Sequence, residues 1–501
     1  MTNSQRIIVN TIAQYTRSVL NVCLSLFSTR LILSALGQID YGIYSVVGGV
    51  VAMLSFITNA LVITTQRYLS YNYGTGDMVK IRDIFGNSML LHLTIGGAMA
   101  IILSAIGPWV VNSMLNIEST RINAAQVVYY AAVFMLLITF TTAPIRALFI
   151  ARENIVYISI IDVCDGILKL LGAIWLCHIG FDRLIAYAGI MTSIMLFEFI
   201  AYSIYSALHF PEFHFPHPKE WNKNYIKALS GFAGWTIYST GCILVRTQGL
   251  AILLNRFLGT IINAAYGIAL QVAGAVQFVS SSIINAFNPQ IMKAEGCGNR
   301  ARMLRLAEYE SKYSFLLLSM VVIPLVVEMK AVLSLWLIEV PDQTVMFCRF
   351  VLIAAVCDQT TIGLNAANQA IGDIRSYSLL LNTIKVLTIP AAWICLHLGF
   401  NAQTTMWCYL ICEATCAIAR IPFMYVTAKL EIGQYIKNVL LRTLPPIVVM
   451  VGLSISITTF IDIPFRFLLT IILTILAGLF ITLFTGMDHS ERQMLLRYLH
   501  R

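Results

Sequence analysis

The sequence predicts an all-α polytopic membrane protein with about 14 transmembrane helices, on three observations. Of its 501 residues, 58% are hydrophobic and 11% are charged, whereas soluble domains hold about 45–50% and about 25%. Apolar runs of about 20 residues, enough to cross ~30 Å of hydrocarbon as helix, recur along the whole chain. Loops rich in basic residues alternate along the chain with loops that hold few, which is the pattern of a membrane protein with a fixed orientation. A soluble domain, a disordered chain and a disulfide-stapled secreted protein are therefore excluded.

Run lengths, and the lack of period-two alternation, favour helices over a membrane barrel. The first run carries Arg17 and Arg30, which makes it too charged for a cleaved signal peptide, so we expect an anchor. The ninth run is short because Glu328 and Lys330 close it early. The predicted spans are residues 10–36, 41–66, 85–111, 123–149, 156–178, 184–208, 229–255, 262–288, 313–329, 343–368, 376–398, 403–428, 439–460 and 465–486.

The basic residues fix the expected orientation. Loops on the side of the amino terminus hold 21 Lys and Arg residues, the opposite loops hold 5, and the other 7 of the 33 lie inside spans. Such a bias over short loops marks the cytoplasmic side, so both termini are expected in the cytoplasm. The formal net charge of +9 reflects this asymmetry and requires no nucleic-acid partner.

The two halves of the chain repeat each other. Three matches support this: Tyr41-Gly42-Ile43 with Tyr266-Gly267-Ile268, Asn59-Ala60-Leu61 with Asn285-Ala286-Phe287, and Ala173-Ile174-Trp175-Leu176-Cys177 with Ala391-Ala392-Trp393-Ile394-Cys395. Six spans per half is an even number, so the halves are parallel repeats related by an axis along the membrane normal.

This repeat predicts the domain organisation. An N-lobe over residues 1–208 and a C-lobe over 229–428 each hold six spans, joined by a cytoplasmic linker at 209–228. Residues 429–501 add two spans without counterparts and a cytoplasmic tail. Two such lobes are typical of transporters that work by alternating access, in which the lobes rock against each other around a cavity at their interface. No Gly-Lys dipeptide occurs, so no phosphate-binding loop for ATP hydrolysis is present.

Polar residues within the first helix of each lobe predict a cationic cavity. Arg17 and Asn21 belong to a polar stripe of the first span, and Arg246 lies on a polar face of the seventh; neither span holds an acid. These cations could face a cavity, pair with acids of neighbouring helices, or reach the headgroups. Arg30 lies on another face about 20 Å further along, where a gate or outer-leaflet role is as plausible.

Other intramembrane charges are predicted to be self-contained or to couple an ion. Asp162, Asp165 and Lys169 share a face of the fifth span, as an ion pair or a proton relay. Lys385 has no acid on its own helix, so we expect an unpaired cation and a ligand candidate. Glu413 and Arg420 share a face of the twelfth span and suggest a structural role. Three acids are possible ion-coupling sites: Asp358, Asp162 and Glu198.

Four segments resemble a known family. They are Ser28-Thr29-Arg30-Leu31-Ile32-Leu33, Asp40-Tyr41-Gly42-Ile43-Tyr44, Thr65-Gln66-Arg67-Tyr68-Leu69-Ser70 and Asn288-Pro289-Gln290-Ile291. They are similar to the bacterial polysaccharide transporters, which translocate lipid-linked O-antigen or capsule repeat units. These belong to the MOP exporter superfamily, with the MATE exporters and the lipid II flippase. The resemblance extends through the first twelve spans.

The resemblance implies two lobes around a cationic cavity that receives a diphosphate-linked sugar while the polyprenyl tail stays in lipid. Arg17 and Arg246 match membrane arginines of the lipid II flippase, and Arg30 matches the family motif without an assigned role. The last two spans, by analogy, offer a groove for the lipid tail. Unlike many MATE exporters, the chain has no carboxylate in its first or seventh span.

We therefore expect a flippase for lipid-linked oligosaccharide in the bacterial inner membrane. Its expected partners are the polyprenyl-diphosphate-linked oligosaccharide, membrane lipids and polysaccharide assembly enzymes, with no cofactor beyond possible coupling to an H⁺ or Na⁺ gradient. The alternative is a MATE-type H⁺- or Na⁺-coupled multidrug exporter. A membrane enzyme such as a polymerase is disfavoured, because the outward loops are short and the repeat suits a transporter.

Overall fold

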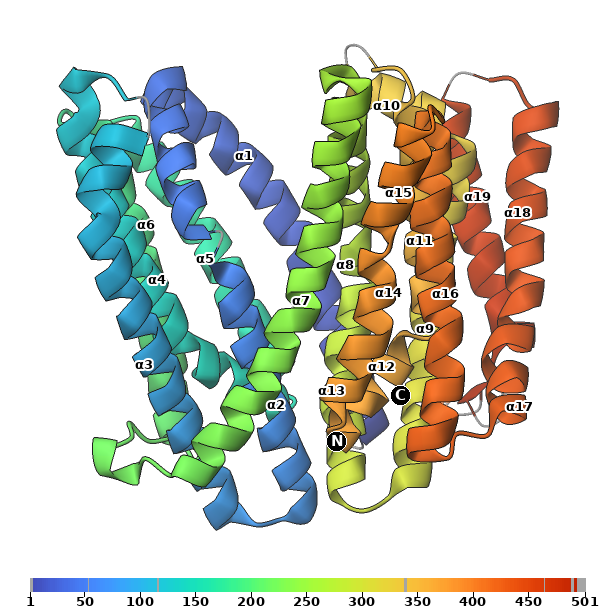
Figure 1. Cartoon of the computed structure of the whole chain (residues 1–501), viewed down its shortest axis with the longest axis horizontal. Helices are drawn as coiled ribbons and strands as arrows, with labels where there is room; N and C mark the ends of the chain where they lie inside the picture. Colours follow the sequence, from blue (N-terminus) through green and yellow to red (C-terminus); the bar gives the residue numbers. More distant parts are fainter. Residues whose placement is uncertain are drawn as a thin grey trace. The chain divides into compact units, whose positions relative to one another are not determined.

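The chain forms two compact helical units, Met1–Ile237 and Tyr238–Arg501 (Figure 1). The computed structural model describes residues 3–52, 54–114, 117–337, 340–463, 465–487 and 491–492, and every regular element in these ranges is a helix. This confirms the predicted all-α class.

The first unit holds six long helices and the first part of a seventh. They are α1 (Asn3–Ala52), α2 (Ser55–Thr75), α3 (Met78–Trp109), α4 (Ile122–Ala151), α5 (Ile155–Leu176), α6 (Arg183–His209) and α7 (Lys223–Leu258), with short turns η1 (Val110–Met114), η2 (Ser119–Arg121) and η3 (Pro218–Glu220).

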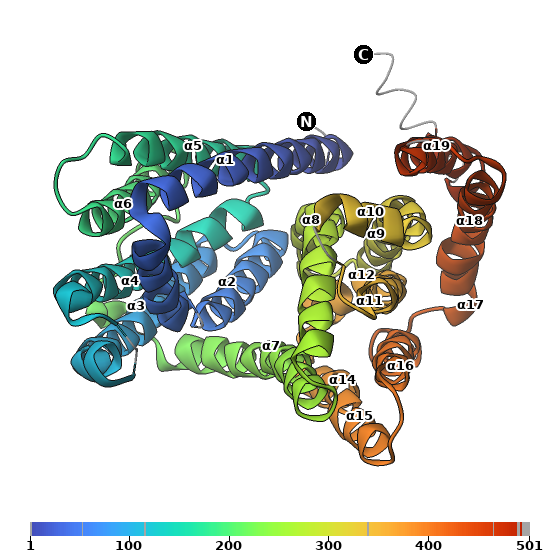
Figure 2. The same cartoon turned by 90° about the horizontal axis from the view of Figure 1, so that it is seen from above.

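The second unit holds the rest of α7 and the remaining helices. They are α8 (Thr260–Gly296), α9 (Arg300–Val327), α10 (Met329–Trp336), α11 (Thr344–Gln359), α12 (Ile362–Ile371), α13 (Ile374–Tyr377), η4 (Ser378–Asn382), α14 (Thr383–Val386), α15 (Thr388–His397), α16 (Ala402–Ala428), α17 (Ile432–Tyr435), η5 (Ile436–Leu441), α18 (Arg442–Phe460), α19 (Arg466–Ile481) and η6 (Thr482–Gly486). The two added spans, α18 and α19, pack on α9 and on each other, at the edge of this unit in Figure 2.

Most predicted spans correspond to single helices. Among the described residues, 11 helices are long and apolar enough to cross a membrane, or up to 12 if the pair α11–α12, bent by 47°, is one span. The predicted span at 156–178 is α5, which three charges make less apolar: Asp162, Asp165 and Lys169. The predicted span at 41–66 is divided between the end of α1 and α2.

A glycine joins the first two spans of each unit. Gly37 bends α1 with φ 76° and ψ 173°, and Gly259 separates α7 from α8 with φ 89° and ψ 178°. This backbone region is essentially restricted to glycine, because a β-carbon would clash there. The two junctions give the predicted repeat a structural counterpart.

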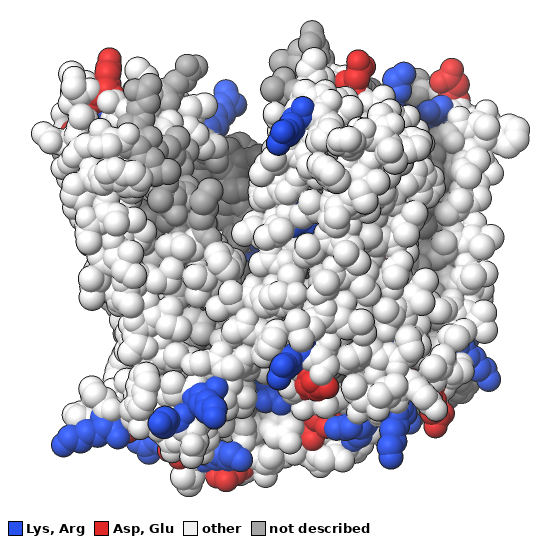
Figure 3. Space-filling view, viewed as in Figure 1, with Lys and Arg blue, Asp and Glu red and all other residues white. Residues whose placement is uncertain are grey.

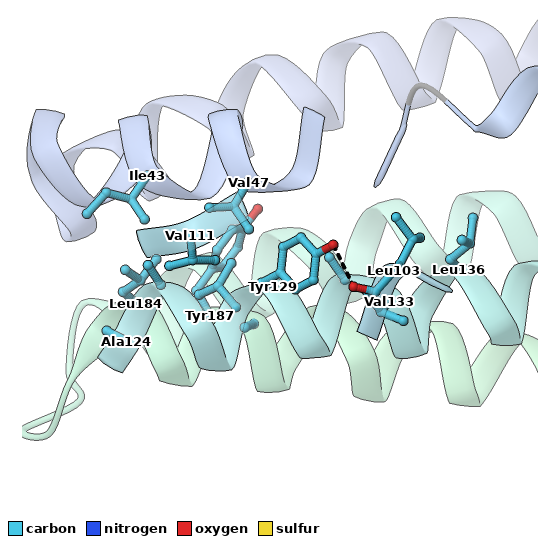
Figure 4. Packing of buried hydrophobic residues seen from close by; sticks show 14 of the residues in the cluster. Ile43, Val47, Leu103, Val111, Ala124, Tyr129, Val133, Leu136, Leu184 and Tyr187 are labelled. Carbon is cyan, nitrogen blue, oxygen red and sulfur yellow. Dashed lines mark hydrogen bonds between the residues drawn. The ribbon is translucent and has the colours of Figure 1, made fainter. Parts of the chain in front are cut away.

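The core of the first unit contains both apolar and aromatic side chains. In Figure 4, Val47 of α1 and Tyr187 of α6 lie among the clustered side chains, and Tyr129 of α4 donates a hydrogen bond of 2.9 Å to the carbonyl oxygen of Leu103. Buried hydroxyls need such partners, since an unmade hydrogen bond costs about 1–3 kcal/mol.

The outer surface of the helices is apolar. Large side chains such as Phe460, which is 87% exposed, face outward from many helices. On the face drawn in Figure 3, charged side chains gather at the helix ends of each unit and leave a pale apolar band between them. A lipid environment accounts for this band, because lipid rather than water can cover it.

The predicted linker at 209–228 packs against the first unit. Glu212 accepts a hydrogen bond of 2.7 Å from Arg152 Nε, and the backbone amide of Asn222 donates to Asn87 Oδ1 at 2.8 Å. Leu229 and Ala233 of α7 belong to the core of this unit. The division between the units therefore falls after the linker, inside α7.

Candidate functional site

Five charged side chains from four helical segments meet inside the second unit. Glu413 of α16 accepts hydrogen bonds from Arg246 of α7 and, at 2.6 Å, from Lys385 of α14. Asp358 of α11 lies 3.2 Å from the Lys385 ammonium and 2.7 Å from the guanidinium of Arg420 of α16. We call these five residues the C-cluster. The exposed fraction is 5% to 7% for all its side chains except Asp358, at 19%.

The break between α11 and α12 places Asp358 in this cluster. Arg420 Nη1 donates to the carbonyl oxygen of Asp358 at 3.1 Å and to Thr361 Oγ1 at 3.3 Å. A helix break frees backbone groups, which must find partners within a membrane protein. Arg420 supplies them, so one side chain stabilises the bend and neutralises the nearby carboxylate.

A cavity of about 260 Å³ opens beside the C-cluster. It is lined by α7, α8, α9, α11, α14 and α16, and its charged lining comes from Arg246, Lys385, Asp358 and Glu413. Arg246 also lies over the ring of Tyr409, 4.6 Å from its centroid. Its Nε is buried and makes no hydrogen bond within the described part of the chain. The cavity therefore brings a free guanidinium donor next to space for a small polar group.

A second group of charges lies inside the first unit. Arg17 of α1 forms an ion pair of 2.6 Å with Asp162 of α5, and Arg146 of α4 approaches the same carboxylate at 3.4 Å. Asp165 and Lys169 form an ion pair of 2.7 Å along α5, as predicted. We call these five residues, with Glu198 of α6, the N-cluster.

The remaining predicted site residues lie as follows. Glu198 is half-buried and makes no hydrogen bond or ion pair among the described residues, although its charge acts on Arg146 and Asp165. Asn21 has a buried Oδ1 without a partner there, close to Gly166 of α5. Arg30 is exposed on α1 and pairs with no described residue.

Two expectations from the sequence need correction. The prediction of an unpaired Lys385 is wrong, because two carboxylates from other helices hold it. Arg17 and Arg246 have no acid on their own helices, but each pairs with an acid of a neighbouring helix. This was the alternative to free cavity cations. A buried unpaired charge is costly, so the fold supplies counterions from distant segments.

The sequence also missed members of both clusters. Arg146 was not among the predicted site residues, yet it lies inside α4 and joins the N-cluster. Its position within the apolar run 123–149 was the available signal. Glu413 and Arg420 were predicted to be structural, whereas Glu413 also lines the cavity.

A further ion-pair group of the first unit joins α1, η2 and the start of α6. Arg121 of η2 binds Asp40, which follows the Gly37 bend of α1, and, at 2.7 Å, Asp182. Asp182 also caps α6 by accepting from the amides of Leu184 and Ile185. Partial burial opposes ionisation, but the hydrogen bonds from Arg121 and these amides outweigh it and hold the pKa of Asp182 below its usual value.

The architecture matches solved transporter structures. The chain is similar to a MATE protein in complex with MaL6, with a TM-score of 0.72 and 13% identity over 87% of this chain and 98% of that one. A MOP superfamily transporter from Pyrococcus furiosus matches with a TM-score of 0.70 and 14% identity. An outward-facing multidrug resistance MATE transporter matches with a TM-score of 0.69 and 16% identity. Each of these two matches covers 87% of this chain and 97% of the other chain. No family model and no curated protein matches the sequence. The chain therefore has the fold of MATE and MOP superfamily transporters.

Proposed function

We propose that the protein is a membrane transporter, a flippase that moves lipid-linked oligosaccharide or polysaccharide repeat units across the bacterial inner membrane by alternating access. Lipopolysaccharide O-antigen units are the expected type of cargo. The protein then performs no catalysis, holds no cofactor and has both termini in the cytoplasm. Its partners are the polyprenyl-diphosphate-linked oligosaccharide, membrane lipids and polysaccharide assembly enzymes.

The observation that carries this proposal is the cation excess of the C-cluster. When all five groups are ionised, three cations face two carboxylates, and the nearby cavity is lined by Arg246 and Lys385 together with Asp358 and Glu413. A diphosphate needs charge-assisted hydrogen bonds to leave water, and a guanidinium donates two in parallel. An exporter of lipophilic cations would need the opposite excess.

Glu413 would be the resident counterion that the cargo replaces. It now accepts from both Arg246 and Lys385, and these two donors would turn to phosphate oxygens when the headgroup enters. Because a buried ion pair costs desolvation energy, exchanging one anion for another is easier than creating a new charged site. Arg17 would act in the same way in the first unit, with Asp162 as its counterion.

The test separates cargo binding from a purely structural ion pair. We would compare R246A with the double variant R246A/E413A in a deletion strain, measuring surface glycan and accumulated lipid-linked intermediates. The double variant leaves no orphaned carboxylate, so it is expected to insert and fold better than R246A yet still to lose export. Full export in R246A/E413A would overturn the proposal.

A matched control is available in the same unit. Arg349 of α11 is an exposed cation whose Nε donates to the carbonyl oxygen of Val326 at 2.9 Å. R349A removes a positive charge without touching the C-cluster, so export should persist. Equal loss in R349A and R246A would mean that any lost cation impairs the protein.

A MATE-type exporter of cationic drugs is the second candidate. The N-cluster favours it, because three carboxylates lie there: Asp162, Asp165 and Glu198. Two of the three structural neighbours named above are MATE proteins, whereas the description of the Pyrococcus furiosus transporter gives it a binding pocket of reverse polarity. Drug hypersensitivity of the deletion strain without accumulated lipid-linked glycan would favour this candidate. Possible H⁺ or Na⁺ coupling through Asp358, Asp162 or Glu198 would show as loss of ion-driven uptake in their amide variants.

A further inference from the structure

Two cysteine side chains are in contact between α15 and α16. The Sγ atoms of Cys395 and Cys408 lie 3.7 Å apart, and both residues are free thiols. A covalent S–S bond is about 2 Å long, so the two sulfur atoms touch without being bonded. Neither residue is among those that line the cavity beside the C-cluster. The proposed transport function therefore leaves this thiol pair without a role.

The repeat of the first unit does not contain the pair. Cys177 corresponds to Cys395 in the repeated segment, but its thiol donates to the carbonyl oxygen of Ala173 on its own helix, at 3.5 Å. Seven residues after the capping residue of the next helix, the first unit has Gly189 and the second has Cys408. The shared architecture thus requires no second thiol at this place, and the pair is a feature of the second unit.

The pair lies near one end of its two helices. Cys395 is two residues before the end of α15, and Cys408 is six residues after the start of α16. Both side chains are half-buried. The neighbouring Trp393 and Trp407 are 47% and 48% exposed. Tryptophan is enriched where a membrane meets water, so these rings indicate that the thiols lie close to the reach of water-soluble reagents.

The predicted orientation assigns this end of the helices to the oxidising side. Residues 398–401 join α15 to α16, and the distribution of basic residues places this loop on the side opposite both termini. That side is the bacterial periplasm if the termini are cytoplasmic, and disulfides form and persist there. This step rests on the orientation that belongs to the proposed function.

We propose that Cys395 and Cys408 are a redox modification site, which forms a disulfide between α15 and α16 by exchange with a disulfide-bearing oxidant. One thiol loses its proton and attacks a sulfur atom of the oxidant, whose other sulfur leaves as a thiolate. The second thiol loses its proton, attacks the mixed disulfide and releases the other half of the oxidant. Two cysteines are oxidised, and the oxidant is reduced to two thiols that take up the two protons.

The crosslink would join two spans that the C-cluster already connects. Helices α14 and α15 belong to one apolar span over residues 374–397, which carries Lys385. Glu413 of α16 lies 2.6 Å from the ammonium of that lysine. A disulfide would tie the same two spans a second time, near the ends of α15 and α16 that the loop joins. Oxidation is therefore expected to oppose their separation.

The test uses the full-length protein, reduced and then treated with oxidised glutathione in detergent. Alkylation, digestion and mass spectrometry should show a peptide crosslinked between Cys395 and Cys408, which a dithiol reductant reverses. Oxidation should also raise the melting temperature, because a crosslink restricts the unfolded chain. C395S and C408S should each lose both effects. The matched controls C177S and C412S should keep both, since Cys177 has no thiol in contact and Cys412 lies one turn beyond Cys408.

Three outcomes would overturn the inference. These are glutathione adducts on Cys395 and Cys408 without a crosslink, a crosslink that uses Cys412 instead, and an equal rise in melting temperature in C395S. Alkylation of intact cells tests the orientation separately. Thiols that crosslink in the purified protein but stay reduced in cells would overturn the periplasmic location. Because the readout is the state of the thiols, failure here leaves the glycan-export test unaffected.

Discussion

The N-cluster and the C-cluster occupy comparable helices of the two units, yet they differ in burial and in charge. In the C-cluster, Arg246 and Glu413 are 7% and 5% exposed, whereas Arg17 and Asp162 of the N-cluster are 22% and 15% exposed. The fifth span of the first unit carries acids, and its counterpart carries Lys385. The repeat therefore keeps an arginine in the first span of each unit, whereas the charges of the fifth span and its counterpart differ in sign.

This difference indicates distinct roles for the two clusters. A pair open to water can exchange partners at low cost, because water solvates the separated charges. A pair excluded from water stays together unless another ion replaces a partner, because each isolated charge is costly. We therefore propose the C-cluster as the stronger candidate for recognising a charged cargo, and the N-cluster as the one whose ion pairs exchange more readily.

The largest expected effect comes from removing a counterion. E413A leaves Arg246 and Lys385 without that carboxylate, and such a loss costs about 3–5 kcal/mol for buried groups. D162A in the N-cluster should cost less, because its partners are better hydrated. Thermal unfolding in detergent compares the two. Equal destabilisation would remove the contrast between the clusters.

The second effect concerns close helix contacts. A β-carbon at Gly363 of α12 would lie 2.0 Å from the carbonyl oxygen of Ala307 of α9, a backbone atom that cannot turn away. At Gly166 of α5 it would meet the side-chain end of Leu24 at 2.9 Å, which can rotate. G363A should therefore destabilise by about 1–3 kcal/mol or more, and G166A by less. The same thermal assay ranks them, and a larger loss in G166A would contradict this view.

A smaller effect is expected at the edge of the N-cluster. Lys169 is 37% exposed and pairs with Asp165 one turn earlier on the same helix. Such pairs contribute about 0.3–0.5 kcal/mol, so K169A should barely change the melting temperature. R420A removes both an ion-pair partner of Asp358 and the hydrogen bonds at the helix break, so it should lower the melting temperature far more than K169A. Similar shifts in the two variants would show that burial does not set the cost.

The smallest effect is pH-dependent and concerns Asp182 at the start of α6. The pKa of Asp182 is lowered, so its contribution to stability is present above its unfolded value of about 3.9 and is lost as the pH falls through the folded value. The counterpart in the second unit is Asn401, an uncharged cap whose side chain accepts from Thr404 N at 3.1 Å. D182N should abolish this part of the acid sensitivity while keeping the cap. Unchanged acid unfolding in D182N would refute the assignment.

The helices could be predicted from the sequence because membrane spans are set by local apolar runs. The ion pairs could not, because each joins residues far apart in the chain. Arg246 and Glu413, for example, are 167 residues apart, and only the folded structure brings their side chains together. Lys312 shows the same limit, because no local pattern predicted that this lysine is buried in α9.

The glycine junctions at Gly37 and Gly259 restrict how the two halves could diverge. Elsewhere the two halves differ in their charges and in the lengths of their helices. At these two junctions, however, no residue other than glycine adopts the required backbone conformation without strain. Substitution of these two glycines is therefore strongly disfavoured, and each half retains the same bend between its first and second spans. Directed evolution of this chain should recover changes almost everywhere on the membrane-facing helices before it recovers one there.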